Sequence, residues 1–330
     1  MVGTVAAACI VASLSFQQGP SSGVSFLSNN GEVEHAFVQF IAKYGRTYAS
    51  KEELPKRFEI FQKNYKMVQA HNAKPEALYT MEINQFADRA DEDFRSITLS
   101  PEDLAEAKTL ETAHTLQQWD SPIAIDWRAQ GVLSPVKDQG AACVSDWAFT
   151  AAAGLESANA IISNQTWMKT EASVQYLIDC DNTDQGCKDG WAGRAVKYVA
   201  KNGYVHTNYY PNQYLAVRRS CRGMYPQDYI KVNSLRSTSY LLVTPQRMKY
   251  YISNQPVMVA INAPACVRNY KNGTLSQNDC DCSHEDYLAS DITTEMLVVG
   301  YGVYQPSDRE SSYCDGYYIL RTSWGVQFGE

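Results

Sequence analysis

The sequence predicts an α+β fold in which a helical part of the chain precedes a strand-rich part. Apolar residues at three- and four-residue spacing indicate helices, and they do so in three stretches: 38–72, 147–162 and 190–202. Apolar runs typical of strands follow in three places: 256–262, 296–303 and 317–324. Because helices come first and strands later in the second half of the chain, we expect two subdomains there, one helical and one β-rich.

The first helical stretch belongs to a leading module that is separated from the rest by a polar segment. Its apolar face is formed by six residues: Phe40, Tyr44, Phe58, Phe61, Tyr65 and Val68. A shorter unit follows at 79–94, and residues 100–122 are acidic and polar without a core periodicity, which is typical of a linker. We therefore expect three parts: a domain over 35–95, a linker over 96–122 and a second domain over 123–330.

The composition is that of a globular protein. With 330 residues, 45% of them hydrophobic and 20% charged, the chain can bury a large core. Its net charge of −7 and the lack of a basic stripe in the sequence argue against nucleic-acid binding. We expect neither a cofactor nor a bound metal.

The N-terminal run 2–16 is apolar, rich in small residues and free of charge. It is short for a bilayer span, so we interpret residues 1–18 as a signal peptide or anchor. The alternative is a terminal strand or helix buried in the fold. Contact with a membrane is expected only if this segment is retained as an anchor.

The cysteines are distributed unevenly: of nine, Cys9 lies in the N-terminal run and the other eight begin at Cys143. This predicts a cysteine-free leading module and a disulfide-bearing second module in an oxidising compartment. Asn164 and Asn272 each begin a glycosylation tripeptide. Together these features favour the secretory pathway, with an extracellular, cell-surface or lysosome- or vacuole-like destination.

Ordered motifs run through both modules. The leading module has polar and apolar residues at fixed spacing: Glu53, Arg57, Phe61, Asn64, Val68 and Asn72, then Asn84, Phe86 and Asp88. The second module contains, in order, "IDWR", "PVKDQG", "WAF", "QYLIDC", "GC..G", "VVGYG" and "SWG". This set resembles the proenzyme form of the papain-like cysteine proteases, in the cathepsin L-like branch, from about residue 36 to the last. Two departures in the leading module are Val68, a conservative change, and Glu82, where the family has glycine.

The resemblance implies a papain-like fold with a helical left and a β-rich right subdomain, preceded by a helical inhibitory propeptide domain. It also implies a reaction with a thiolate nucleophile, a histidine that shares its charge and an asparagine that orients the histidine. The residue before "WAF" is Asp146, the residue six before the first glycine of "VVGYG" is Thr294, and the residue before "SW" is Thr322. Of the catalytic set only Gln139, an oxyanion donor in the family, keeps its identity. We therefore expect an inactive protease.

Other side chains are not expected to replace the missing groups. Cys143 is the nearest thiol, but the resemblance implies that it is oxidised. Ser145 would need a base, and the second module has only two histidines, His206 and His284. Hydrolysis assisted by a metal at Asp146 is the alternative, although histidines and cysteines do not cluster there at ligand spacing.

Asp146 is expected at a helix N-terminus, which favours an anion. Because an aspartate is ionised at neutral pH, we expect it to accept hydrogen bonds from the helix N–H groups and from Gln139. Asp189 and Glu295 are expected near Asp146. The functional alternative is that these acids capture a cation or ligand together with Asp146, and the other interpretation is that they are ordinary solvated side chains. The cleft implied by the resemblance is lined by seven residues: Asp189, Gly190, Trp191, Ala260, Ile292, Glu295 and Trp324.

The resemblance implies two disulfides, Cys143–Cys187 and Cys180–Cys221. The family partner of Cys282 and the family's final strand are both expected beyond Glu330. One further bridge is expected among Cys266, Cys280 and Cys314.

We expect a non-catalytic protein that serves as a binding or structural subunit, with protein partners or a larger assembly and with its own propeptide in the cleft. Two alternatives stay open. One is residual or unconventional hydrolysis, and the other is a decoy or regulator of active cathepsins.

Overall fold

The computed structural model describes the following residues: 31–94, 97, 99–105, 120–140, 142–212, 218–231, 243–275, 292–305, 308 and 316–330. The expectations for residues 1–18, His284, Cys280, Cys282 and Cys314 lie outside them. The chain divides into two compact units, Met1–Thr47 and Tyr48–Glu330. Within the described stretches, no helix combines the length and hydropathy needed to cross a bilayer.

The first unit is described through helix α1 (Gly31–Tyr44). Phe37 and Phe40 share one face, and the ring of Tyr44 lies 5.1 Å from that of Phe40. The helix stops at Gly45, whose φ of 58° is left-handed and favours glycine. The stretch predicted as helical over 38–72 is therefore two helices, and the second, α2 (Glu53–Asn72), belongs to the second unit.

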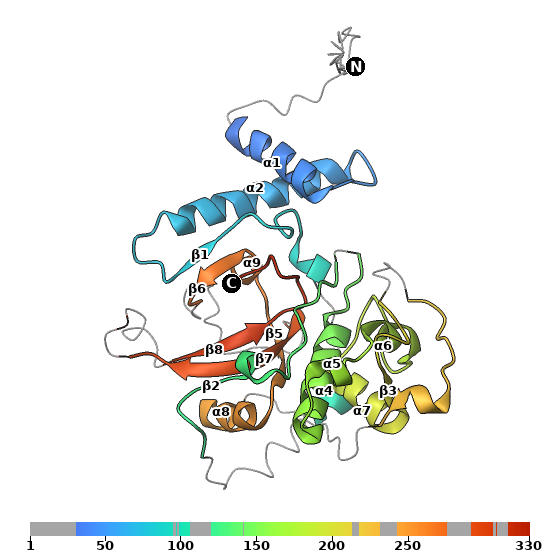
Figure 1. Ribbon diagram of the computed structural model, residues 1–330. Helices are drawn as coiled ribbons and strands as arrows, with labels where there is room; N and C mark the ends of the chain where they lie inside the picture. The colour runs from blue at the N-terminus through green and yellow to red at the C-terminus, as the bar shows by residue number, and fades with distance from the viewer. Residues whose placement is uncertain are drawn as a thin grey trace, which may run out of the picture. The chain divides into compact units, whose positions relative to one another are not determined.

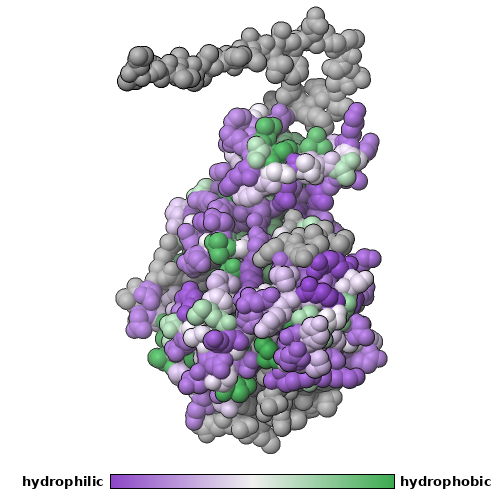
Figure 2. All heavy atoms as spheres, turned by 45° about the vertical axis from the view of Figure 1, so that its right-hand side comes forward, coloured by the Kyte–Doolittle hydropathy of each residue, from purple (hydrophilic) through white to green (hydrophobic). Residues whose placement is uncertain are grey.

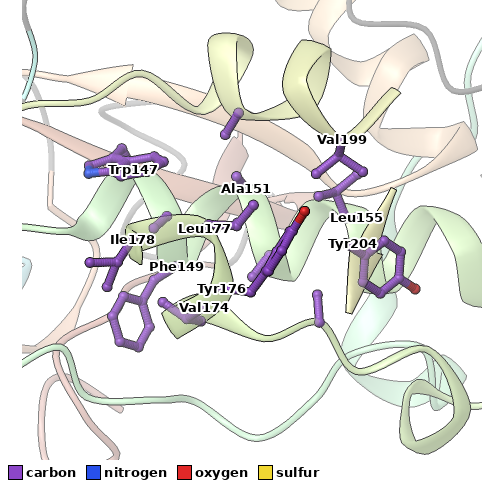
Figure 3. Close-up of a cluster of buried hydrophobic side chains, with 14 of the residues drawn as sticks. Trp147, Phe149, Ala151, Leu155, Val174, Tyr176, Leu177, Ile178, Val199 and Tyr204 are labelled. Atoms are coloured by element: carbon purple, nitrogen blue, oxygen red, sulfur yellow. The ribbon is translucent and has the colours of Figure 1, made fainter. Parts of the chain in front are cut away.

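The helical subdomain of the second unit is built around α4 (Asp146–Ser163). Its other elements are α5 (Trp167–Thr170), α6 (Val174–Cys180), α7 (Ala192–Asn202), β3 (Tyr204–Val205), η3 (Pro226–Asp228) and β4 (Tyr229–Ile230). Trp147, Leu155, Tyr176, Leu177 and Tyr204 are fully buried in one cluster between these elements (Figure 3). The run of alanines in α4 allows the neighbouring helices to approach closely, so this cluster fixes α4 inside the subdomain.

The β-rich subdomain is one antiparallel sheet with β7 (Thr294–Val303) at its centre. Strand β7 pairs with β2 (Ile125–Asp126), β5 (Val257–Ile261) and β8 (Gly316–Arg321). Helix α8 (Pro245–Asn254) covers β7 through Ile252, which packs against Val298 and Tyr301. Short elements flank the sheet: η2 (Trp127–Gln130), α9 (Ala265–Arg268) and β6 (Tyr270–Gly273). Figure 1 shows α4, α6 and α7 grouped beside this sheet.

The rest of the leading module joins the sheet side of the second unit. After α2 come β1 (Tyr79–Met81) and η1 (Asp91–Phe94), and β1 pairs antiparallel with β6. The sequence does not predict this pairing, because runs of three and four residues are too short to show a strand periodicity of their own. Asn84 donates to the Arg268 carbonyl at 2.7 Å, and this bond continues the connection.

Several elements differ in extent from the sequence expectations, and the strand predicted over 317–324 is observed as β8, which ends at Arg321. The helix predicted over 190–202 begins at Ala192, because Gly190 lies against the Trp147 ring and Trp191 is extended. The strand predicted over 296–303 starts two residues earlier at Thr294, where it still pairs with Ile261 of β5. The linker is partly regular, since residues 101–105 are helical. On the face drawn in Figure 2, hydrophilic residues cover most of the described surface and hydrophobic ones form small separate spots.

Candidate functional site

Asp146 occupies the start of α4. Ser145 is the N-cap, and its carbonyl accepts from Ala148 N at 2.9 Å and from Phe149 N at 3.2 Å. Asp146 lies at the helix N-terminus, as expected, but it is the first residue inside the helix and not its cap, and only 1% of it is exposed. The carboxylate therefore lies at the positive end of a buried helix.

The carboxylate of Asp146 bonds across to strand β7. Its Oδ2 accepts from the Thr294 hydroxyl at 2.6 Å and from Glu295 N at 2.7 Å. Thr294 and Glu295 are each 2% exposed. The structure thus brings together the two residues that the sequence assigns to the nucleophile and base positions, and it joins them as an acceptor and its donor.

Glu295 extends this site to the start of α7. Both of its carboxyl oxygens accept from Ala192 N at 3.1 Å. Complete burial, followed by the charge of Asp146, raises the pKa of Glu295 well above its ordinary value. Ala260 of β5 pairs in register with Glu295, so the two residues that the sequence expects at the cleft wall are neighbours in the sheet.

A second acid, Asp184, forms an ion-pair cluster beside α7. Its Oδ1 accepts from Arg194 Nε at 2.7 Å and from Trp191 N at 3.0 Å. Burial raises the pKa of Asp184 to about 7, although the charge of Arg194 opposes that rise. Arg194 Nη1 also donates to Asp103 of the linker at 2.9 Å, and its Nη2 lies 3.7 Å from Asp189. Asp189 is therefore an ion-pair partner.

Gln139 and Thr322 lie in a different set of contacts. Gln139 N donates to the Ser323 carbonyl at 2.8 Å, and Gln139 Oε1 accepts from the Ser323 hydroxyl at 2.5 Å. Trp324 N donates to Thr322 Oγ1 at 3.4 Å, a long contact. The side-chain oxygen of Gln139 thus accepts a hydrogen bond from Ser323. Asp146 Oδ2, in contrast, accepts from Thr294 and Glu295 of β7.

Thr322 lines a cavity of about 10 Å³, which is room for about one water molecule. The cavity adjoins a buried charge cluster in which Lys137 Nζ lies 2.8 Å from Glu156 and 3.1 Å from Glu171. Arg321 also lines it, and burial lowers the pKa of its guanidinium. These charges stabilise the contact between α4 and the chain around residue 137, and the sequence analysis missed them because the partners are far apart in the chain.

Trp324, expected in the cleft, is covered by the leading module. Its ring packs edge-to-face with Phe86 at 5.0 Å and with Phe328 at 4.7 Å. Gln85 Nε2 donates to its carbonyl at 2.9 Å, and Phe94 completes the aromatic cluster. This part of the expected cleft is therefore occupied by the chain's own leading module.

The spaced motif of α2 shapes the segment that makes these contacts. Arg57 binds Glu53 at 3.3 Å and also pairs with Asp93. Asn64 donates to the Ala87 carbonyl at 2.9 Å, and Asn72 exchanges two bonds with Met81. Since Arg57, Asn64 and Asn72 hold the segment 81–93 against α2, these motif residues help to present Phe86 to Trp324.

The two disulfides implied by the sequence are present. Cys143 bonds to Cys187, and Cys180 bonds to Cys221. Cys266 is also disulfide-bonded, in agreement with a further bridge. Cys143 is therefore not available as a thiolate. Of the two histidines in the second module, the structure describes His206. Its ring contacts the Met168 carbonyl at 3.2 Å.

The described residues contain no group of three histidine, cysteine, aspartate or glutamate side chains with the geometry of a metal site. The acids near Asp146 are instead engaged by backbone N–H groups, by Thr294 and by Arg194. Arg194 and Asp184 were not singled out from the sequence. Their signal exists only as isolated charges at 184 and 194, with no local pattern that pairs them.

Comparison with known proteins agrees with the motifs. Two family models match the chain: Papain family cysteine protease over residues 121–330, and Cathepsin propeptide inhibitor domain (I29) over residues 37–94. The chain is 32% identical over 309 residues to Pro-cathepsin H of Medicago truncatula. This alignment covers 91% of this chain and 81% of the relative. It is 30% identical to thiol protease aleurain of Arabidopsis thaliana, over 91% of this chain and 79% of the relative.

Solved structures give the same result. The structure of digestive procathepsin L 3 from the larval midgut of Tenebrio molitor matches with a TM-score of 0.67 and 27% identity, over 91% of each chain. The expected α+β, papain-like fold with a leading propeptide domain is confirmed.

Proposed function

Because the chain belongs to the papain family of cysteine proteases, we propose that it is a non-catalytic member that acts as a binding or structural subunit. One observation carries this proposal: the Asp146 carboxylate and the Thr294 hydroxyl are hydrogen-bonded at 2.6 Å in the positions that the motifs assign to nucleophile and base. The relatives are named as a pro-cathepsin and a thiol protease. This chain is proposed to differ from them at the nucleophile and base positions.

The chemistry of these two groups supports an inactive centre. Acyl transfer in this family depends on a thiolate that attacks a carbonyl and a histidine that later protonates the leaving amine. A carboxylate attacks amides poorly, and a threonine hydroxyl does not titrate near neutral pH, so Thr294 cannot deliver that proton. Asp146 instead keeps a negative charge that two donors from β7 stabilise.

The surroundings of the pair also oppose substrate entry. Asp146, Thr294 and Glu295 are all nearly inaccessible, and Glu295 is bonded to the start of α7. A peptide side chain that entered here would have to displace a buried carboxyl group from its N–H partner, at a cost of about 1–3 kcal/mol.

Retention of the leading module is the second part of the proposal. Strand β1 pairs with β6, and Phe86 packs on Trp324, so removal of this module would expose an aromatic cluster to water. A chain without a nucleophile also cannot cut its own linker. We propose a protein of the secretory pathway, glycosylated at Asn164 and Asn272, whose partners meet the retained module or the back of the peptidase-like module.

Activity measurements test the first part. The full-length chain, purified without added protease, is expected to leave a fluorogenic peptide library intact at every pH. Turnover that Gln139→Ala abolishes would contradict the proposal, because it would reveal a working oxyanion site. That result would favour unconventional hydrolysis, the first alternative.

A reconstruction tests the assignment of positions. Combining Asp146→Cys, Thr294→His and Thr322→Asn with Glu295→Ala is expected to give peptidase activity about 100-fold or more above a matched control that keeps Thr294, because the control lacks a general base. Equal activity in both variants would show that Thr294 is not the base position.

Intact mass and N-terminal sequencing of protein from its native source test retention. The expected species still contains the leading module, and a dominant species that starts near residues 123–126 would contradict it. Inhibition of an active cathepsin by the intact chain would favour the second alternative, a decoy or regulator.

A further inference from the structure

The side chain of Arg194 bonds the described part of the linker to α7. The guanidinium binds three carboxylates from separate places: Asp184 at 2.7 Å, Asp103 at 2.9 Å and Asp189 at 3.7 Å. Only 19% of the Arg194 side chain is exposed, and Asp184 is completely buried. Arg194 therefore connects the linker to the loop before α7, and the carboxylates of Asp184 and Asp103 compete for its charge.

The linker turn is folded around Asp103. Ser100 N and the Ser100 hydroxyl donate to Asp103 Oδ2 at 3.0 and 2.9 Å, and Asp103 N donates back to Ser100 Oγ at 3.2 Å. Although burial acts in the opposite direction, these bonds and Arg194 hold the pKa of Asp103 below its ordinary value. Asp103 therefore keeps its charge in mild acid.

Asp184 is placed to take up a proton first. Both of its donors, Arg194 Nε and Trp191 N, bind Oδ1, while Oδ2 is buried without a hydrogen-bond partner among the described residues. An oxygen in that situation is stabilised when it carries a proton instead of a charge. The groups that face Asp184 are Arg194 of α7, Asp103 of the linker, Asp181 and Asp189 of its own loop, Arg218 at its carbonyl, and Glu295 of β7 with Asp146 behind it.

We propose that Arg194 is a latch that holds the linker on the peptidase-like module and that binds it more tightly in acid than at neutral pH. At high pH the guanidinium divides its charge between Asp184 and Asp103. As the pH falls through 7, Asp184 takes a proton and stops competing, whereas Asp103 stays ionised. The Arg194–Asp103 ion pair then strengthens until the pH falls below the lowered pKa of Asp103.

This inference rests on the proposed retention of the leading module and adds a regulation to it. Acidification would strengthen the contact between the linker and α7. In an acidic compartment the linker would therefore be held more tightly than at neutral pH.

Hydrogen exchange of the full-length chain, followed by mass spectrometry, tests the latch. The readout is the protection factor of residues 99–105, corrected for intrinsic exchange, at about pH 8 and about pH 5.5. We expect higher protection at the lower pH in the unmodified chain. Asp103→Asn should lower protection roughly tenfold at the lower pH, because a charged hydrogen bond is lost. Glu102 is an exposed neighbour, and Glu102→Gln makes the same change of charge but should not lower the protection of residues 99–105.

Asp184→Asn supplies the decisive comparison, since it makes the competing group permanently neutral. It should give high protection at both pH values and remove the pH dependence. Protection that falls in acid in the unmodified chain, or that is the same in Asp103→Asn and Glu102→Gln, would overturn the latch. Because Asp103 lies in the linker turn, Asp103→Asn tests the latch even if Asp184→Asn fails to fold. Peptidase activity is not measured here, so an active chain would contradict the proposed function without deciding the latch.

Discussion

At the scale of single residues, the site depends on where one buried charge is placed. Asp146 is inaccessible, yet its carboxylate is stabilised by the start of α4 and by two donors from β7. The hydroxyl of Thr294 is one of these donors. The residue that the motifs assign to the histidine position is therefore a hydrogen-bond donor to the residue that they assign to the cysteine position.

Thr294→Val tests this bond. Valine has nearly the same shape but no hydroxyl, so the Asp146 carboxylate loses a donor in a buried site. We expect the free energy of unfolding to fall by about 1–3 kcal/mol, measured by chemical denaturation. Thr322→Val is the matched control: its oxygen only accepts a long 3.4 Å contact, and its effect should be small. Equal losses in the two variants would mean that the Asp146–Thr294 bond adds no stability.

At the scale of elements, the two sides of the site are fixed by the packing of α4 against the loop before α7. Gly190 carries this contact. A Cβ at this position would lie 2.3 Å from the nearest atom of the Trp147 ring, and that ring is fully buried at the start of α4. Any side chain at 190 must therefore move Trp147 and, with it, the backbone next to Asp146.

Gly190→Ala is expected to reduce the free energy of unfolding by about 1–3 kcal/mol through overpacking. Gly223→Ala is its control, because a Cβ there meets no atom within 4 Å and the glycine has no left-handed φ. Thermal unfolding of both variants measures the difference. A stable Gly190→Ala protein with unchanged near-ultraviolet circular dichroism would contradict this account of the contact.

At the scale of the whole molecule, buried acids set the dependence of stability on pH. Burial raises the pKa of Glu295 and raises that of Asp184 to about 7, so both groups bind protons in the folded chain that they lack when unfolded. For a raised carboxyl pKa, the folded state is favoured at low pH and loses this advantage as the pH rises through the folded value. Several carboxyls with lowered pKa values, Asp93 and Asp126 among them, act only near and below pH 4.

We therefore expect the free energy of unfolding to increase on acidification from about pH 8 to about pH 5, by on the order of 1–3 kcal/mol. Urea titrations at several pH values measure this slope. Asp184→Asn should flatten it, whereas Asp138→Asn, a change at an acid outside the cluster, should leave it in place. A slope of the opposite sign in the unmodified chain would show that these acids are ionised in the folded protein.

The sequence by itself determined the class of fold, the family, the order of the modules and two disulfides. It also predicts, through its motifs, that Asp146, Thr294 and Thr322 stand at the three catalytic positions of the family. These features are encoded locally, in periodic apolar residues and in motifs whose members lie close together in the chain. Helix α4 and strands β5 and β7 were predictable for this reason. The helix break at Gly45 and the short β1–β6 pairing were not, because a three-residue strand has no periodicity and depends on its partner.

Only the tertiary structure decided how the residues at the predicted catalytic positions interact. Asp146 and Thr294 are 148 residues apart, and Arg194 joins residues at 103, 184 and 189. From the sequence, Asp146 was expected to cap the helix and to accept a hydrogen bond from Gln139. In the structure its carboxylate accepts from β7, and the side-chain oxygen of Gln139 accepts from Ser323. The physical reason is that a charge buried between two subdomains takes its partners from whichever backbone and side-chain donors the fold brings within about 3 Å. No local pattern of residues records those distances.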